Sequence, residues 1–262
     1  DYSSLPTLTP IQKADSGAIQ LNFSVLKAFF DCPYKFKLIS LYGFCQAITE
    51  RMGYGNSIHN ILMELHRSHL EGVDVSTIDL NNLIEKHIHI PYAKDVVLEN
   101  IKKSALEVTK TYINDNASDF DNIEYAEKEI EIDLGEGIIV NGRMDLIIKK
   151  DLGGHEVTTI VDFKSSKEAQ KENITMEQLA LYALGYRELS GKTADLLQIF
   201  NLDEKGHSKK TQQLDNNQLD AIKTKIVDSA NEIRNNQLNK TCLPKMCDSC
   251  FHKQLCSGYK KI

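Results

Sequence analysis

The chain has 262 residues, of which 41% are hydrophobic and 26% charged, and it carries a net charge of −6. This length suffices for one large domain or two small ones with a buried core, and the composition is that of a soluble globular protein. No apolar run approaches the roughly 20 residues that cross a bilayer, and no signal peptide is seen, which predicts a cytoplasmic protein without a membrane partner. The first residue, Asp1, favours a domain cut from a longer protein or a trimmed chain.

The acidic net charge counts against a free-standing nucleic-acid binder, which is usually basic. Groups of lysines could still line a local basic groove, or could be ordinary solvated surface residues. These groups are Lys35 with Lys37, Lys149 with Lys150, Lys164 to Lys171 and Lys205 to Lys210. Charge alone therefore does not identify the partner.

The first part of the chain is predicted to be mainly helical, because apolar residues recur at helical spacing there. Proline interrupts the first helical pattern, since it lacks the backbone donor that a helix interior needs. In chain order we expect an irregular lead-in over residues 1–20, a helix over 21–40 broken at Pro33, a helix from about Asn56 to Leu70, and further helices over 76–117 divided near Pro91.

The pattern then changes to the alternation that is typical of strands. Strands are predicted at 128–134, 138–149 and 156–164, a helix from Thr175 to Leu189, strands at 194–201 and 208–213, and a helix capped by Asp215 that ends near Asn235. The order of three strands, a helix and a strand indicates an α/β fold built on a mixed sheet. We expect a single domain over 21–262, with a helical part at 21–120, an α/β catalytic core at 121–235 and a cysteine-rich loop at 236–262.

The strongest chemical signal lies in two neighbouring strands. Asp145 ends the sequence Gly142-Arg143-Met144-Asp145, and Asp162 and Lys164 stand two residues apart, so that their side chains share one face of a strand. Two close carboxylates repel each other unless a cation lies between them, and such oxygen ligands suit Mg²⁺ or Mn²⁺. The lysine could then orient or deprotonate an attacking water. A structural Asp–Lys salt bridge at a strand end is the alternative.

Three further side chains have both a structural and a functional interpretation. His59 lies beside the apolar stripe of its helix, where an isolated histidine is usually a partly buried polar residue, as His66 could also be. Gln178 and Tyr182 share one helix face because they are four residues apart. Thr175-x-x-Gln178 also matches a capping box, and Tyr182 alone could belong to the core.

Taken in order, these motifs resemble the RecB-type branch of the PD-(D/E)XK nucleases. The resemblance rests on Gly55-x-x-x-His59, Gly142-Arg143-Met144-Asp145, Asp162-Phe163-Lys164, Gln178-x-x-x-Tyr182 and the opening Cys32-Pro33-Tyr34-Lys35-Phe36. It covers about residues 21–258 and implies a restriction-endonuclease-like mixed sheet flanked by helices. It also implies Mg²⁺ or Mn²⁺ bound by His59, Asp145, Asp162 and the backbone carbonyl of Phe163. Lys164 would be the catalytic lysine, with Gln178 and Tyr182 contacting DNA or supporting the site.

Six cysteines are present, and without any sign of secretion they favour metal binding over disulfides. Cys247, Cys250 and Cys256 supply three thiolates from one loop, and Cys32 could supply the fourth for Zn²⁺ or a 4Fe–4S cluster. Spacing alone favours zinc, whereas the resemblance favours the iron–sulfur subgroup of these nucleases, found in AddB-like enzymes and CRISPR-associated relatives. Cys45 and Cys242 are spare, and Cys242 is the substitute if one assignment is wrong.

The sequence thus predicts a metal-dependent deoxyribonuclease that acts on single strands or DNA ends, as a module of a helicase–nuclease or repair system. One alternative is a stand-alone CRISPR-associated exonuclease. The others are a DNA-binding module without activity and an unrelated scaffold stabilised by zinc.

Overall fold

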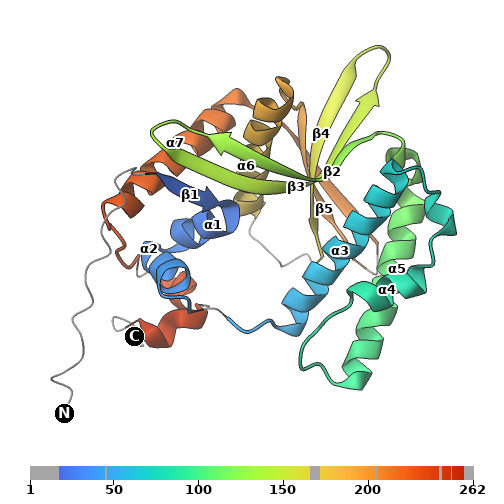
Figure 1. The fold of residues 1–262 in the computed structure, drawn as a ribbon, viewed down its shortest axis with the longest axis horizontal. Coiled ribbons are helices and arrows are strands. Elements are labelled where there is room, and N and C mark those ends of the chain that lie inside the picture. Colours follow the sequence, from blue (N-terminus) through green and yellow to red (C-terminus); the bar gives the residue numbers. More distant parts are fainter. Residues whose placement is uncertain are drawn as a thin grey trace.

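The computed structural model describes residues 18–44, 46–165, 172–203, 206–241, 244–248 and 250–256. Within them a six-stranded mixed sheet is flanked by helices on both faces (Figure 1). The predicted mixed sheet flanked by helices is confirmed, with one strand more than the sequence predicted. Most of the predicted lead-in, Cys45, Cys242, Lys167, Lys171 and Lys205 lie outside the described residues. None of the described helices is both long and apolar enough to span a bilayer.

The sheet is organised around its longest strand. The strands are β1 Ile19–Asn22, β2 Ile123–Asp133, β3 Ile138–Asp151, β4 Glu156–Lys164, β5 Leu196–Asn201 and β6 Ser208–Gln213. β3 pairs with β2 along one edge and with β1 and β4 along the other, and β5 and then β6 follow β4. β1 and β3 are parallel, as are β4 and β5, and the remaining pairs are antiparallel.

β1 and β4 both pair with the same edge of β3, but at different points along its length. The gap between them forms a fork in the sheet. β1 pairs with β3 only as far as Asn141, and β4 begins to pair at Leu146. Between these points, β3 is paired only with β2 among the described strands. The fork therefore coincides with the Gly-Arg-Met-Asp motif and leaves its backbone edge open for a site.

Three helices cover one face of the sheet: α1 Phe23–Asp31, α6 Glu172–Ser190 and α7 Asn216–Arg234. Their apolar side chains form one core with those of the strands, including Leu26, Leu181 and Ile226. Asp215 caps α7 through a capping box with Gln218, so the predicted start of this helix is confirmed.

Three other helices cover the opposite face: α3 Glu50–Leu70, α4 Leu80–His87 and α5 Asp95–Phe120, with a 3₁₀ turn at Val75–Thr77. Ile58, Ile61, Leu62 and Leu65 are buried in a second core, as their spacing predicted. The helix starts earlier than expected, because Thr49 caps it by accepting the N–H of Met52. Gly53 and Gly55, which are poor helix formers, lie inside the first turns.

The sequence prediction missed β1, since it extended the first helix from Leu21. Only the four residues Ile19–Asn22 form this strand, and their partners are the residues 138–141 of β3. No local alternation marks so short a strand. Pairing with a distant strand fixes it, and such pairing cannot be read from nearby residues.

α2 Pro33–Phe36 and the C-terminal helical segment, which are far apart in the sequence, lie side by side (Figure 1). α2 and a π-helical turn at Lys37–Leu41 follow α1, and the expected cysteine loop contains the short helix α8 Pro244–Asp248 and a 3₁₀ turn at Phe251–Leu255. Leu238 packs with Phe29 and Phe36 in a small third core. The Thr241 hydroxyl donates to the carbonyl of Asp31 at 3.4 Å.

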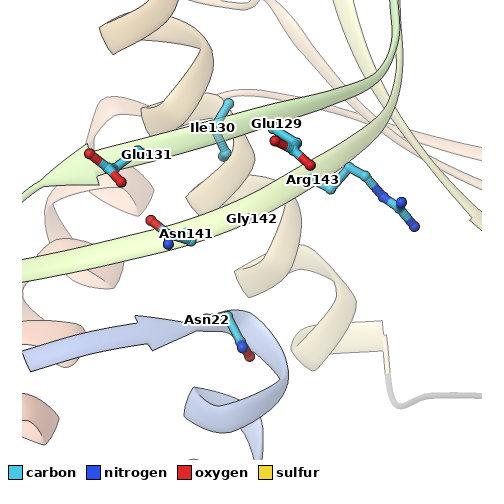
Figure 2. Close-up of a pocket in the computed structure, with 7 residues that line it drawn as sticks. All are labelled: Asn22, Glu129, Ile130, Glu131, Asn141, Gly142 and Arg143. Carbon is cyan, nitrogen blue, oxygen red and sulfur yellow. The ribbon is translucent and has the colours of Figure 1, made fainter.

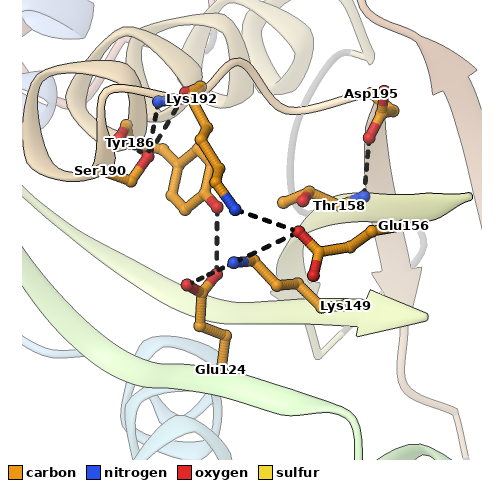
Figure 3. A network of polar contacts seen from close by, with 8 residues as sticks. All are labelled: Glu124, Lys149, Glu156, Thr158, Tyr186, Ser190, Lys192 and Asp195. Atoms are coloured by element: carbon orange, nitrogen blue, oxygen red, sulfur yellow. Dashed lines mark hydrogen bonds and ion pairs between the residues drawn. The ribbon is translucent and has the colours of Figure 1, made fainter. Parts of the chain in front are cut away.

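Some of the lysines that the sequence suggested for a basic groove form ion pairs with neighbouring carboxylates. Lys149 Nζ lies 2.7 Å from Glu124, which also accepts from the Tyr186 hydroxyl at 3.1 Å (Figure 3). Lys150 pairs with Asp119, and Lys35 with Asp31. The network in Figure 3 ties the end of α6 to β2 and β4 rather than offering free cations.

Candidate active site

The pairing of β3 with β4 brings the two aspartates together, as the sequence predicted. Leu146 lies opposite Val161 in an antiparallel register, so the next residues, Asp145 and Asp162, also face each other. Asp145 Oδ2 accepts the backbone N–H of Phe163 at 2.8 Å. The hydrogen bond fixes the first carboxylate against the strand that carries the second.

At Asp145, the side chains of β3 exchange the two faces of the sheet. Val140 and Met144 belong to the core under α6, whereas Leu146 and Ile148 belong to the core under α3. In a regular strand, the side chains of these four even-numbered residues would all lie on the same face of the sheet. The irregularity places Asp145 between the two cores, where groups from both faces of the sheet can reach it.

Asp162 is almost completely buried, with 1% of its surface exposed. Burial raises the pKa of its carboxyl to about 6, although the nearby Lys164 ammonium opposes the shift. Lys164 Nζ lies 2.5 Å from Oδ2, yet this oxygen has no contact of hydrogen-bond geometry with the described residues. A buried carboxylate with an unsatisfied oxygen is a suitable ligand for a cation.

Lys164 is held by a short polar chain from α6. Its ammonium lies 3.5 Å from Gln178 Oε1, and Gln178 Nε2 donates to the Tyr182 hydroxyl at 2.7 Å. Burial raises the pKa of Tyr182, and the charges of Asp145 and Asp162 add to this. α6 begins before Thr175, so the capping-box interpretation of Gln178 is wrong, and this side chain faces the site instead.

His59 reaches the site from the opposite face of the sheet. Its Nδ1 lies 3.5 Å from Asp145 Oδ2, and its ring contacts the edge of the Phe163 ring at 6.5 Å between centroids. One turn earlier, a Cβ on Gly55 would come within 3.0 Å of Ser165 Oγ. The glycine thus lets α3 approach the end of β4, which positions His59 over the aspartates.

The sequence missed Glu127, a third carboxylate at this point. Glu127 lies on β2 between the partners of Leu146 and Met144, and therefore opposite Asp145. One ligand atom from each of His59, Glu127 and Asp145 lies within 4.8 Å of the other two. Burial raises the pKa of Glu127 to about 7, and the charge of Asp145 adds to the shift.

The sequence also missed Lys27, a half-buried residue of α1. Burial lowers the pKa of its ammonium, Lys164 lowers it further, and Asp31 and Asp162 oppose the shift. A helix that is remote in sequence thus contributes a second cation to the electrostatic surroundings of Lys164. No motif marks Lys27, because a lysine on a surface helix is ordinarily solvated.

An open cavity of about 460 Å³ occupies the fork of the sheet. It extends from Asn22 at the start of α1 across β3 to the outer edge of β2, and Arg143 projects at its rim (Figure 2). Its floor, Gly142, lies close to Tyr182, since a Cβ there would come within 3.4 Å of Tyr182 Cε1. The cavity therefore adjoins the candidate site on its α6 side.

The four candidate cluster ligands are half-buried cysteines that form no disulfide among the described residues: Cys32, Cys247, Cys250 and Cys256. Burial would raise the pKa of the Cys32 thiol, but hydrogen bonds from Thr241 and from the backbone at Lys35 and Tyr34 lower it overall. Through these hydrogen bonds, Thr241 also holds the C-terminal segment beside Cys32. The donor set and the lowered thiol pKa fit a group held by thiolates.

These features define a class of protein: a mixed sheet, open at one fork, with two acidic residues and a lysine at the opening. The family model for the PD-(D/E)XK nuclease superfamily matches residues 20–257. The chain therefore belongs to this superfamily of nucleases, which use divalent metal ions to cleave phosphodiesters. Among proteins with curated functions, none matches the chain significantly.

A solved structure shares the fold. A crystal structure of a protein from Eubacterium rectale, described as a candidate exonuclease, is 15% identical in sequence, with a TM-score of 0.54. The match covers 98% of this chain and 96% of that one. The match to the crystal structure of SSO0001 has 16% sequence identity, covers 87% of this chain and 96% of that one, and has a TM-score of 0.37.

Proposed function

We propose that the chain is a RecB-type, divalent-metal-dependent deoxyribonuclease. The observation that carries the proposal is the convergence of Asp145, Asp162 and Lys164 at the fork of the sheet. Two largely buried carboxylates lie together there, and the Lys164 ammonium lies 2.5 Å from Asp162 Oδ2. One ammonium does not balance two buried carboxylates, so the arrangement suits a site that binds a further cation.

His59, Asp145, Asp162 and the backbone carbonyl of Phe163 would hold Mg²⁺ or Mn²⁺. Oxygen donors with one imidazole are ligands that these ions accept. The bound ion supplies Lewis-acid stabilisation of the phosphodiester and acidifies water. Gln178 and Tyr182 have a different task, because they contact Lys164 and each other rather than the carboxylates.

Hydrolysis forms a bond from a water oxygen to phosphorus and breaks the bond to the leaving oxygen, which takes up a proton. Lys164 is placed to orient that water or to neutralise the charge that grows on the phosphate. Gln178 restricts the ammonium to one direction, and Tyr182 in turn restricts Gln178. Lys27 adds positive charge on the α1 side, where an anionic strand would be stabilised.

The substrate in this proposal is DNA, as single strands or ends, and the chain works as a module of a helicase–nuclease or repair system. The net charge of −6 is compatible with a module whose parent or partner grips the DNA. A stand-alone CRISPR-associated exonuclease uses the same chemistry and is the alternative. We further propose one domain over residues 21–262, with an iron–sulfur cluster on Cys32, Cys247, Cys250 and Cys256, or zinc in its place.

The test is degradation of end-labelled single-stranded DNA with Mn²⁺, comparing the wild type with Lys164→Ala. We expect at least about a 100-fold loss of rate, the usual scale for removal of a group that handles a proton. Lys223→Ala is the matched control, because this lysine is exposed on α7. An RNA strand of the same sequence tests the choice of DNA, and duplexes with one blocked end test the preference for ends.

Equal rates for the wild type and Lys164→Ala would contradict the proposed mechanism. A wild type that binds DNA without degrading it would indicate a binding module without activity.

A further inference from the structure

Glu127 occupies an unusual environment for a glutamate in a strand. Only 4% of its side chain is exposed, and its carboxylate joins Asp145 and His59 within 4.8 Å. A buried carboxylate is costly unless it is paired or binds a cation. Its position next to another carboxylate adds repulsion, which a bound cation between the two carboxylates would remove.

The backbone at Glu127 is what turns the side chain inward. Along β2, Glu129, Glu131 and Asp133 are exposed, and a regular strand would expose Glu127 as well. Glu127 has φ +50°, in the left-handed region that non-glycine residues rarely adopt. Strain of this kind is concentrated at functional sites, where it aims a side chain at its target.

The charge of Glu127 is balanced from outside by Arg143. Arg143 Nε lies 2.6 Å from Glu127 Oε2, and 53% of the arginine side chain is exposed at the rim of the cavity (Figure 2). The contact does not have hydrogen-bond geometry, since Oε2 has no hydrogen-bond partner among the described residues. Because more than half of the arginine side chain is exposed, it can turn towards solvent when another cation takes its place beside Glu127.

We propose that Glu127 is a further ligand of the divalent cation, and that Arg143 neutralises this carboxylate only while the cation is absent. The inference rests on the proposed metal centre, which it extends from the β3–β4 pair to β2. The arginine and the metal compete for one carboxylate. Removal of the glutamate should therefore weaken metal binding, and removal of the arginine should strengthen it.

The experiment measures Mn²⁺ affinity without nucleic acid, from the electron paramagnetic resonance signal of the free ion, on the full chain. We expect Glu127→Gln to weaken binding by at least about 10-fold, the lower end of what loss of groups that support a metal site costs. Arg143→Gln should tighten binding several-fold. Glu131→Gln, an exposed position of the same strand, is the matched control and should leave the affinity unchanged.

The double variant Glu127→Gln with Arg143→Gln separates competition from a general effect of charge. If Arg143 acts through Glu127, its removal produces no gain once Glu127 is gone. Melting temperatures without metal show that the variants are folded. A Glu127→Gln variant that unfolds is replaced by Glu127→Asp, which keeps the charge but shortens the reach and should also weaken Mn²⁺ binding.

Asp145→Asn distinguishes failure of this inference from failure of the proposed function. If Asp145→Asn abolishes Mn²⁺ binding and Glu127→Gln does not change it, Glu127 is not a ligand and the metal centre stands. If neither variant changes the affinity, the proposed metal centre itself is wrong. A gain from Arg143→Gln that persists without Glu127 overturns the competition between arginine and metal.

Discussion

Two histidines of α3, seven residues apart and so on nearly the same helix face, show how surroundings decide the role of one residue type. His59 stays partly exposed beside Asp145, whereas His66 is buried, stacks on Phe163 and bonds the Tyr112 hydroxyl at 2.8 Å. Burial lowers the pKa of His66 from 6.5 to about 3, and the charge of His69 contributes. His66 is thus a neutral core residue that supports the ring beneath the candidate metal site.

This environment predicts a pH dependence of stability. Between pH 6.5 and about 3 the unfolded chain binds a proton at His66 and the folded chain does not, so the free energy of unfolding falls as pH falls through this window. At pH 5 the loss should reach about 2 kcal/mol, because each unit is worth about 1.4 kcal/mol. Urea unfolding at pH 7 and pH 5 should show a change that is less favourable by about 2 kcal/mol in the wild type than in His66→Gln, because the other titrating groups are the same in both proteins.

His155→Gln is the control for this measurement, since His155 lies in an exposed turn and its variant should behave as the wild type does. A His66→Gln variant with the full wild-type loss between the two pH values would show that His66 is not held neutral.

At the scale of elements, the site depends on how closely α6 approaches the sheet. Gln178 and Tyr182 lie on this helix, and Gly185 follows them on the face that meets β2. A Cβ at Gly185 would come within 2.2 Å of Ile130 Cδ1 and 3.0 Å of Ile130 Cβ. The glycine therefore sets the distance at which the two polar side chains reach Lys164.

Gly185→Ala should destabilise the fold by about 1–3 kcal/mol, the usual cost of overpacking, although alanine favours the helix itself. The nuclease rate should also fall, because α6 must shift with Gln178 and Tyr182. Thermal unfolding and the DNA degradation assay measure the two effects. Ile130→Val removes the Cδ1 atom of the clash.

The double variant Gly185→Ala with Ile130→Val tests whether the clash is the cause. It should recover part of the loss, as residues in contact do not act additively. If the two changes are simply additive, the contact between α6 and β2 does not explain the effect of Gly185→Ala.

At the scale of the whole molecule, a segment near the C-terminus packs against the segment that joins α1 to α2. Thr241 bonds the end of α1, and Lys240 lies over the Tyr34 ring, 4.9 Å from its centroid. Cys32 is at this junction, and Cys250 and Cys256 follow in the same C-terminal segment. A group bound by these thiolates would close a loop that contains nearly all of the α/β core.

Cys32→Ser should therefore bleach the protein and lower its melting temperature. By analogy with a disulfide that closes a very long loop, the stabilisation lost is about 4–5 kcal/mol. Visible absorbance, iron and zinc content and thermal unfolding of one sample measure the effect. Cys45→Ser is the control, because this cysteine is spare in the motif. A colourless wild type that holds one zinc ion would contradict the iron–sulfur proposal. The proposal that a group bound by these thiolates closes the loop would stand.

The sequence alone determined the α/β class, β4 at 156–164, the cap at Asp215 and the meeting of Asp145 with Asp162, because these follow from periodicity, local capping and hairpin pairing. Only the tertiary structure decided β1, the positions of Glu127 and Lys27 beside the other site residues and the contact of Gln178 with Lys164. The physical reason is distance along the chain. The left-handed backbone of Glu127 turns inward a side chain that regular alternation would place in solvent. Burial beside charges from distant parts of the chain shifts the pKa of a side chain.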